Sequence, residues 1–191
     1  MGLGAGLMAV LAGLVFWLSR GSAPPAVTSD AAGPEASTAS TGGPETPPDI
    51  SNMTPRERFD RLYNRIMKSA ESGDQNGVER FTPMALMAYQ QLDTIDADAR
   101  FHAALLKLHT GDVAGAKALG DTVLIQHPGH LLGYIILGTA ARWAKDEVEL
   151  KRQYTAFLKH YDAELKTALP EYKDHARSLE DFKKAAEGKS S

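Results

Sequence analysis

Residues 97–130, ADARFHAALLKLHTGDVAGAKALGDTVLIQHPGH, and residues 131–164, LLGYIILGTAARWAKDEVELKRQYTAFLKHYDAE, are two consecutive stretches of 34 residues. Gly111-Asp112 stands in the first stretch where Lys145-Asp146 stands in the second. A period of 34 residues is typical of stacked helical hairpins, because one hairpin alone cannot bury its apolar face. The register therefore predicts an all-α fold that builds a binding surface rather than a catalytic pocket.

The helical pattern extends upstream of these two units. Thr54-Pro55-Arg56-Glu57 predicts a helix start with a threonine N-cap, a proline in the first turn and a glutamate at the capping-box position. The apolar stripe that follows ends at Gly73-Asp74, a typical helix stop. A second run over 78–92 is interrupted by Thr82-Pro83, where we expect a kink or a new helix start capped by the threonine. These runs form a degenerate first unit over about 59–92.

The remaining apolar spacing predicts the rest of the domain. Helices are expected over 97–110, 113–126, 131–144 and 147–161, which gives about three antiparallel hairpins in all. A last amphipathic segment over about 172–187 would place one apolar face on the preceding pair and act as a C-terminal capping helix. Its apolar positions are Tyr172, Ala176, Leu179, Phe182 and Ala186. The predicted helical-repeat domain covers residues 53–188.

The first 20 residues have a different character. Gly2 to Ser19 contains no charged residue, and 18 helical residues span roughly 27 Å, close to the thickness of a bilayer core. We therefore expect residues 1–20 to be a transmembrane signal anchor that contacts the membrane through residues 2–19. A cleaved signal peptide is the alternative. It is disfavoured because Pro24 follows the small residues at 21–23 and no basic region precedes the apolar run.

Residues 21–52 are predicted to be a disordered linker. Ala, Gly, Pro, Ser and Thr fill 24 of the 30 positions in 21–50, which leaves too few apolar side chains to offset the entropy of ordering. Arg20 alone would favour a cytoplasmic C-terminal side. The linker is typical of an extracytoplasmic tether, so we expect a single-pass protein of a bacterial-type inner membrane with its repeat domain outside the cytoplasm.

Composition excludes several classes of function. The chain has no cysteine, which rules out disulfides, thiol catalysis and cysteine–zinc sites. Its formal charge of −3 comes from the first 50 residues, where Arg20 stands against four acidic residues. Residues 51–191 then hold 20 basic and 20 acidic side chains. A balanced domain has no basic patch typical of nucleic-acid binding, so we expect no nucleic-acid partner.

The two in-phase units resemble the tetratricopeptide repeat (TPR) family, and the similarity extends over roughly 55–164. Its signature combines an aromatic, Leu-Gly and a tyrosine on the first helix with an alanine, an aromatic and a closing proline on the second. Unit 131–164 matches at Tyr134, Leu137, Gly138, Ala141, Leu150 and Tyr154, with Asp162 at the usual proline position. Unit 97–130 matches at Ala104, Ala116 and Pro128, with Arg100 and Gly120 replacing the expected aromatics.

The resemblance implies that the first helix of each hairpin lines a concave groove for a protein or peptide. Arg142-Trp143 is the strongest candidate pair, since an arginine beside an amphipathic aromatic suits peptide binding. Phe101, Leu105 and Ile135 have an alternative role as ordinary core residues, and Trp143 as packing against the next helix. The implied groove residues are Tyr63, Met67, Asp98, Phe101, Leu105, His109, Ile135, Thr139, Arg142 and Trp143.

No motif predicts catalysis, a cofactor or a metal. His102 and His109 are seven residues apart on one helical face, and His127 and His130 flank a Pro-Gly turn. No metalloprotease, nucleophile-elbow or phosphate-loop motif is present. We therefore expect no catalytic residue, no metal ligand and no cofactor.

These observations favour a non-enzymatic, membrane-tethered TPR scaffold that binds a protein or peptide partner in its groove. One alternative is a structural protein that self-associates into a homo-oligomer through its repeat domain, since three repeats are near the minimum for a stable stack. A less favoured alternative is a metal-dependent enzyme that uses His102 and His109 or the C-terminal carboxylates.

Overall fold

The computed structural model describes residues 53–189, and this part of the chain folds into eight α-helices with no strand. The predicted all-α class is confirmed. The anchor predicted for 1–20 and the linker predicted for 21–52 lie outside the described residues, and within 53–189 no helix has the length and hydropathy needed to cross a membrane. The helices are α2 (Pro55–Ser72), α3 (Gln75–Gln90), α4 (Ala97–His109), α5 (Val113–Gln126), α6 (Leu131–Trp143), α7 (Glu147–Leu165), α8 (Pro170–Asp174) and α9 (Ala176–Lys189).

Helix α2 begins and ends where the sequence predicts. The Thr54 hydroxyl accepts a hydrogen bond from the Glu57 N–H at 3.2 Å, and the Glu57 carboxylate accepts one from the Thr54 N–H at 2.9 Å, which completes the capping box. Gly73 ends the helix with a φ of 76°, a left-handed conformation that is free of steric cost only without a Cβ. Local sequence alone is enough to set both ends of this helix.

The joint between the two helices of a hairpin has the same geometry three times. A residue with a left-handed backbone precedes an aspartate that caps the next helix, at Gly73-Asp74, Gly111-Asp112 and Lys145-Asp146. Each aspartate accepts a hydrogen bond from the backbone N–H three residues ahead, at 2.8 to 2.9 Å. Lys145 has a φ of 57°, a conformation that costs a non-glycine residue about 1–2 kcal/mol. The register seen in the sequence is this repeated turn.

Helix α3 differs from its prediction. It runs without interruption from Gln75 to Gln90, so the helix restart expected at Thr82-Pro83 is wrong, and the helix begins three residues before the expected position 78. The Thr82 hydroxyl does not cap a new helix but donates to the Val78 carbonyl one turn back, at 2.7 Å. Proline removes one backbone donor here without ending the helix.

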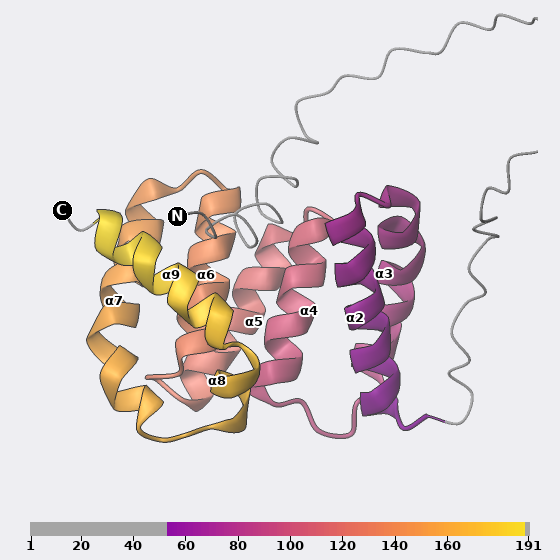
Figure 1. Ribbon diagram of the computed structural model, residues 1–191, viewed down its shortest axis with the longest axis horizontal. Coiled ribbons are helices and arrows are strands. Elements are labelled where there is room, and N and C mark those ends of the chain that lie inside the picture. Colours follow the sequence, from indigo (N-terminus) through magenta and orange to yellow (C-terminus); the bar gives the residue numbers. More distant parts are fainter. Residues whose placement is uncertain (1–52, 190–191) are drawn as a thin grey trace, which may run out of the picture.

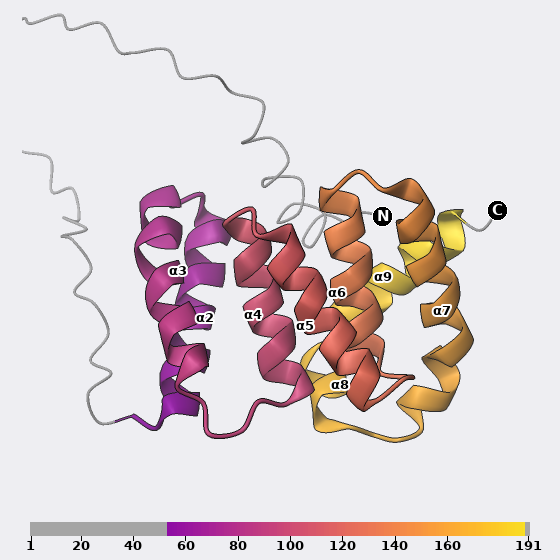
Figure 2. The same ribbon diagram turned by 180° about the vertical axis from the view of Figure 1, so that it is seen from behind.

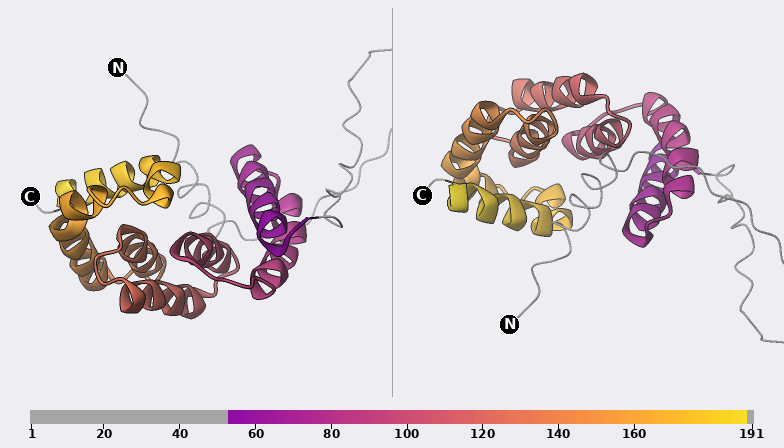
Figure 3. Two further views of the ribbon diagram at one scale, coloured as in Figure 1. Left: turned by 90° about the horizontal axis from the view of Figure 1, so that it is seen from below. Right: turned by 90° about the horizontal axis from the view of Figure 1, so that it is seen from above.

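Consecutive helices from α2 to α7 lie side by side and antiparallel in a curved stack, in which α3 and α4 are in the smallest contact (Figures 1 to 3). Glycine permits close contact between neighbouring pairs. A Cβ on Gly120 of α5 would lie 2.9 Å from Ile136 and Leu137 of α6, and one on Gly133 would lie 2.6 Å from Leu124. Helices α2, α4 and α6 lie on the inner side of the curve (Figure 3).

The C-terminal segment is broken at His175 into α8 and α9, where the sequence predicts one helix. Its apolar face is buried as expected, because the Phe182 ring lies edge-on to Tyr154 at 4.8 Å and to Phe157 at 4.9 Å. However, α9 does more than cover the end of the stack. It crosses the inner side of the curve, and His175 at its start reaches Asp98 of α4 (Figure 3). The expected capping helix is therefore also a wall of the concave side.

A polar network ties the turn between α5 and α6 to this C-terminal segment. The buried Tyr172 hydroxyl donates to the Glu164 carboxylate at 2.7 Å and accepts from the Leu131 N–H at 3.1 Å. The histidines that flank the Pro-Gly turn have partners in the same network, His127 with Glu164 at 3.0 Å and His130 with Glu171 at 3.1 Å. These two histidines thus have a structural role.

Candidate functional site

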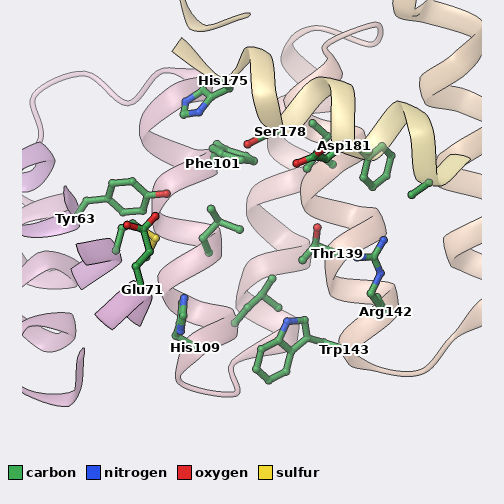
Figure 4. Close-up of a pocket in the computed structure, with 16 residues that line it drawn as sticks. Tyr63, Glu71, Phe101, His109, Thr139, Arg142, Trp143, His175, Ser178 and Asp181 are labelled. Carbon is green, nitrogen blue, oxygen red and sulfur yellow. The ribbon is translucent and has the colours of Figure 1, made fainter. Parts of the chain in front are cut away.

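A groove opens on the inner side of the stack, between α2, α4, α6 and α9 (Figure 4). Its cavity has a volume of about 270 Å³ and is built from four helices that are far apart in the sequence. The lining residues are Tyr63, Met67 and Glu71 from α2, Phe101, Leu105, Leu108 and His109 from α4, Ile135, Thr139, Arg142 and Trp143 from α6, and His175, Ser178, Asp181, Phe182 and Ala185 from α9 and the residue before it.

Nine of the ten residues predicted for the groove lie in this lining. They share a face because they are spaced three or four residues apart on the first helix of each pair, as Phe101, Leu105 and His109 are on α4. Asp98 is the tenth, and it does not line the groove. It lies about one turn before Phe101 on the same helix and pairs with Arg56 and His175 instead. Whether the nine residues bind a partner stays a prediction.

The apolar floor of the groove, formed by Phe101, Leu105 and Ile135, also has the alternative role expected for these residues, as part of the core. Phe101 is 2% exposed and Ile135 is 5% exposed, and both belong to the apolar core of α4 to α9. Leu105 and Trp143 are partly buried and pack against the same core. The floor of the groove is thus the inner surface of the core, and its shape depends on the packing of the whole stack.

The α9 side of the groove is absent from the predicted site. Ser178, Asp181, Phe182 and Ala185 repeat at helical spacing, and this periodicity predicts an amphipathic helix. It contains no information on which surface the helix covers, since α8 and α9 follow α7 outside the 34-residue register. Glu71 is also absent from the prediction. It lies one turn beyond Met67, at the end of α2, and so outside the positions implied by the family resemblance.

Polar groups surround the apolar floor. Arg142 donates to the Tyr154 hydroxyl at 2.6 Å, which holds its guanidinium at the groove next to Trp143. Glu71 on α2 and Asp181 on α9 place carboxylates on the two sides (Figure 4). Burial lowers the pKa of His109 below its ordinary value of 6.5, so this imidazole is uncharged at neutral pH. The charged side chains of the lining, apart from its histidines, are thus Arg142, Glu71 and Asp181.

Beside the groove, a polar cluster joins α2, α4 and the corner between α8 and α9. His175 Nε2 lies 2.6 Å from Asp98 Oδ1, and His102 Nε2 lies 3.7 Å from the same oxygen. Arg56 of α2 binds the other Asp98 oxygen and also Asp96, the latter at 2.8 Å. Asp98 and His102 are one helical turn apart, a spacing visible in the sequence, whereas His175 comes from a distant segment.

The protonation states in this cluster follow from burial and from the neighbouring charges. Burial alone would raise the pKa of Asp98, but its hydrogen bond with His175 and the nearby His102 and Arg56 hold that pKa below its ordinary value. Burial lowers the pKa of His102 to about 4, against the opposing effect of the Asp98 carboxylate. At neutral pH, Asp98 is therefore ionised and His102 is uncharged.

Comparisons of this chain with protein-family models, with curated proteins and with solved structures find no match. The resemblance to TPR proteins thus rests on the residues of the two in-phase units, and the function rests on the geometry of the groove.

Proposed function

We propose that this chain is a non-enzymatic scaffold of the TPR type whose groove binds a peptide segment of a protein partner. The observation that carries the proposal is that residues from the first helix of three successive pairs meet in one cavity. Helical-repeat proteins use such inner surfaces for recognition, and the paired packing of α2 to α7 supports this type.

The chemistry of the lining defines the segment that fits it. Phe101, Leu105 and Ile135 offer an apolar floor, and Arg142 with Trp143 supplies the kind of anchor that dominates peptide binding. A cavity of about 270 Å³ is slightly smaller than typical small-ligand pockets, which begin at about 300 Å³, and it suits single side chains of a peptide. Two carboxylates against one guanidinium favour an apolar segment that also carries a basic side chain.

We further propose that this binding takes place at a membrane. The sequence of residues 2–19 supports an anchor and that of 21–52 a flexible tether, with the groove on the extracytoplasmic side. A flexible tether of this length would let the groove search a region of about 30 Å around its anchor. The partner is then a protein that is itself located at, or recruited to, that membrane.

Site-specific photo-crosslinking of the full-length chain in cells tests the groove. A photoreactive residue in place of Trp143 should yield a partner adduct, and one in place of Ile125, which is 80% exposed on α5, should not. Ala185→Phe fills the cavity from α9 without changing charge, so it should abolish the Trp143 adduct. Equal adducts from both positions would contradict the proposal, and adducts between two copies of the chain would favour the self-associating structural protein instead.

A random-peptide display library tests the chemistry of the segment. Selection on the full-length chain in detergent should enrich apolar peptides that contain Lys or Arg. Asp181→Lys and Glu71→Lys should each weaken their binding, because each reverses a charge at the edge of the floor. Enrichment of acidic peptides, or equal binding to the Ala185→Phe variant, would argue against this occupant.

A further inference from the structure

Three side chains that suit a metal ion converge where α4 meets the start of α9. Asp98, His102 and His175 each offer one donor atom, and these atoms all lie within 4.8 Å of one another. Donors bound to zinc at about 2.0–2.2 Å in a tetrahedral site are roughly 3.4 Å apart. The separations of 2.6 Å and 3.7 Å from Asp98 Oδ1 to the two imidazoles bracket this value. Small side-chain adjustments would therefore place all three donors around one ion.

The His102 imidazole is prepared to act as a ligand. Its Nδ1 is buried and has no hydrogen-bond partner among the described residues, and its Nε2 lies beyond hydrogen-bond distance of Asp98. The ring is held in place by stacking on Tyr63, with 3.8 Å between the ring centroids. A neutral imidazole can bind a metal ion without first losing a proton. An ion at Nε2 would give this nitrogen the partner that Asp98 is too distant to supply, whereas Nδ1 would stay without one.

The charge around the cluster also favours a cation. Arg56 is shared among three carboxylates, Asp60 and Asp96 at 2.8 Å each and Asp98 in a shorter contact. One guanidinium against three carboxylates leaves these four side chains with an excess of negative charge. Arg56 binds Asp98 through Oδ2, which leaves Oδ1 directed toward the two histidines. Ligating carboxylates are commonly held in this way by an outer hydrogen-bond donor.

We propose that Asp98, His102 and His175 form a binding site for a divalent transition-metal ion of the Zn²⁺ class. Two imidazole nitrogens and one carboxylate oxygen suit Zn²⁺ and do not suit Ca²⁺ or Mg²⁺, which prefer oxygen donors alone. The ion replaces the hydrogen bond between His175 and Asp98 and so joins α4 to the start of α9. A fourth position remains for water or another donor beside the groove, since His175 also lines the cavity. The assignment of this metal site does not rest on the proposed peptide binding.

Equilibrium dialysis of the untagged full-length chain against Zn²⁺ alone, after treatment with a chelator, tests the site. One equivalent of Zn²⁺ should bind. His102→Ala and His175→Ala should each lower the affinity by at least about 100-fold, since even the loss of an outer partner costs 10- to 100-fold. The matched variants His109→Ala and His160→Ala, which remove histidines outside the cluster, should keep the wild-type affinity. Equal affinity in all four variants, or no binding by the wild type, overturns the assignment.

Two measurements on the wild-type chain keep the test decisive if a variant fails to fold. X-ray absorption of the bound Zn²⁺ should detect two imidazole ligands, and none or one overturns the assignment. The unfolding temperature should rise with Zn²⁺, because the three ligands come together only in the folded chain. A Zn²⁺-independent unfolding temperature in the presence of stoichiometric binding would mean that the ion binds elsewhere.

Discussion

The helices form two regions that are held together differently. The N-terminal hairpin, α2 with α3, has its own apolar core, to which α4 contributes mainly the small side chains of Ala99 and Ala103 together with Leu106. The C-terminal body, α4 to α9, has a separate core in which Phe182 of α9 reaches the aromatic rings of α7. Contact between α3 and α4 is much smaller than contact within any pair. Part of the link to α2 is polar, because Arg56 pairs with the exposed Asp96 and with the largely buried Asp98.

This difference matters for function because the groove spans both regions. Tyr63, Met67 and Glu71 belong to the hairpin, and the other lining residues belong to the body. The hairpin is joined to the body by a small apolar seam and by the ion pairs of Arg56, whereas the body is held by the larger core of α4 to α9. We expect the hairpin to open at a lower free energy than the body, and one wall of the groove to adapt to its occupant while the other stays rigid.

Phe182→Ala should have the largest effect. The ring is buried between Tyr154 and Phe157 and over Gly138, where an added Cβ would lie 2.5 Å from the ring. Its removal should lower the free energy of unfolding by about 3–5 kcal/mol, measured by urea denaturation of the full-length chain. Val148→Ala, at a position 83% exposed, should change it by less than about 0.5 kcal/mol. A loss below about 1 kcal/mol for Phe182→Ala would mean that α9 does not hold the body together.

Ala103→Leu should loosen the hairpin and spare the body. Ala103 is fully buried in the core that α4 shares with the hairpin, and overpacking such a site costs about 1–3 kcal/mol. Native-state hydrogen exchange should show faster exchange of α2 and α3 amides with little change in α6 to α9. The matched substitution Ala118→Leu, on the exposed side of α5, should change neither. Uniform loss of protection over all helices would show that the two regions unfold as one unit.

Tyr172→Phe should weaken the body at its C-terminal network. The change leaves the Leu131 N–H without its acceptor and removes a donor to Glu164, which should cost about 1–3 kcal/mol in thermal or urea unfolding. Tyr161→Phe is the control, since the Tyr161 hydroxyl has no hydrogen bond among the described residues and its ring contact with Lys183 is retained. Equal effects of the two substitutions would rule out the network as a source of stability.

The pH dependence of stability should include a contribution from the groove. Burial lowers the folded-state pKa of His109 below its ordinary value of 6.5, so the unfolded chain binds the proton more readily. This contribution is present above pH 6.5 and is lost as pH falls from there toward the lowered pKa. His109→Gln should therefore lose less stability than the wild type between about pH 7 and pH 5, measured by urea denaturation across that range. An unchanged pH profile would contradict the burial of this imidazole.

Lys145→Gly should produce the smallest change, a gain in stability. Lys145 adopts the left-handed conformation that Gly73 and Gly111 adopt at the other two joints. Relief of its backbone strain, less the greater flexibility of glycine in the unfolded chain, should stabilise the third pair by about 0.5–1 kcal/mol in urea denaturation. Gly111→Ala should destabilise the second joint by about 1 kcal/mol for the converse reason. A loss of stability in Lys145→Gly would mean that the lysine side chain stabilises the turn.

Features that depend on residues close together in the sequence are predicted better than features that depend on distant contacts. The capping box at Thr54 and the helix end at Gly73 are predicted correctly because each depends on residues at most four positions apart. Nine of the ten residues implied by the family resemblance line the cavity, but their role in binding a partner stays a prediction. Of the two outcomes expected at Thr82-Pro83, a kink or a restart, the restart is wrong, because Phe81 and Ala85 are buried before and after the exposed proline and the helix continues through it.

The structure of residues 53–189 is thus determined partly by local sequence pattern and partly by contacts between distant segments. The apolar spacing along the sequence determines the all-α class, because helical periodicity follows from backbone geometry within each segment. The path of α9 across that face, the second wall of the groove and the meeting of Asp98 with His175 depend on contacts between segments 77 residues apart. No local pattern encodes such contacts, since they arise only when the buried surfaces of the whole stack are fitted to one another.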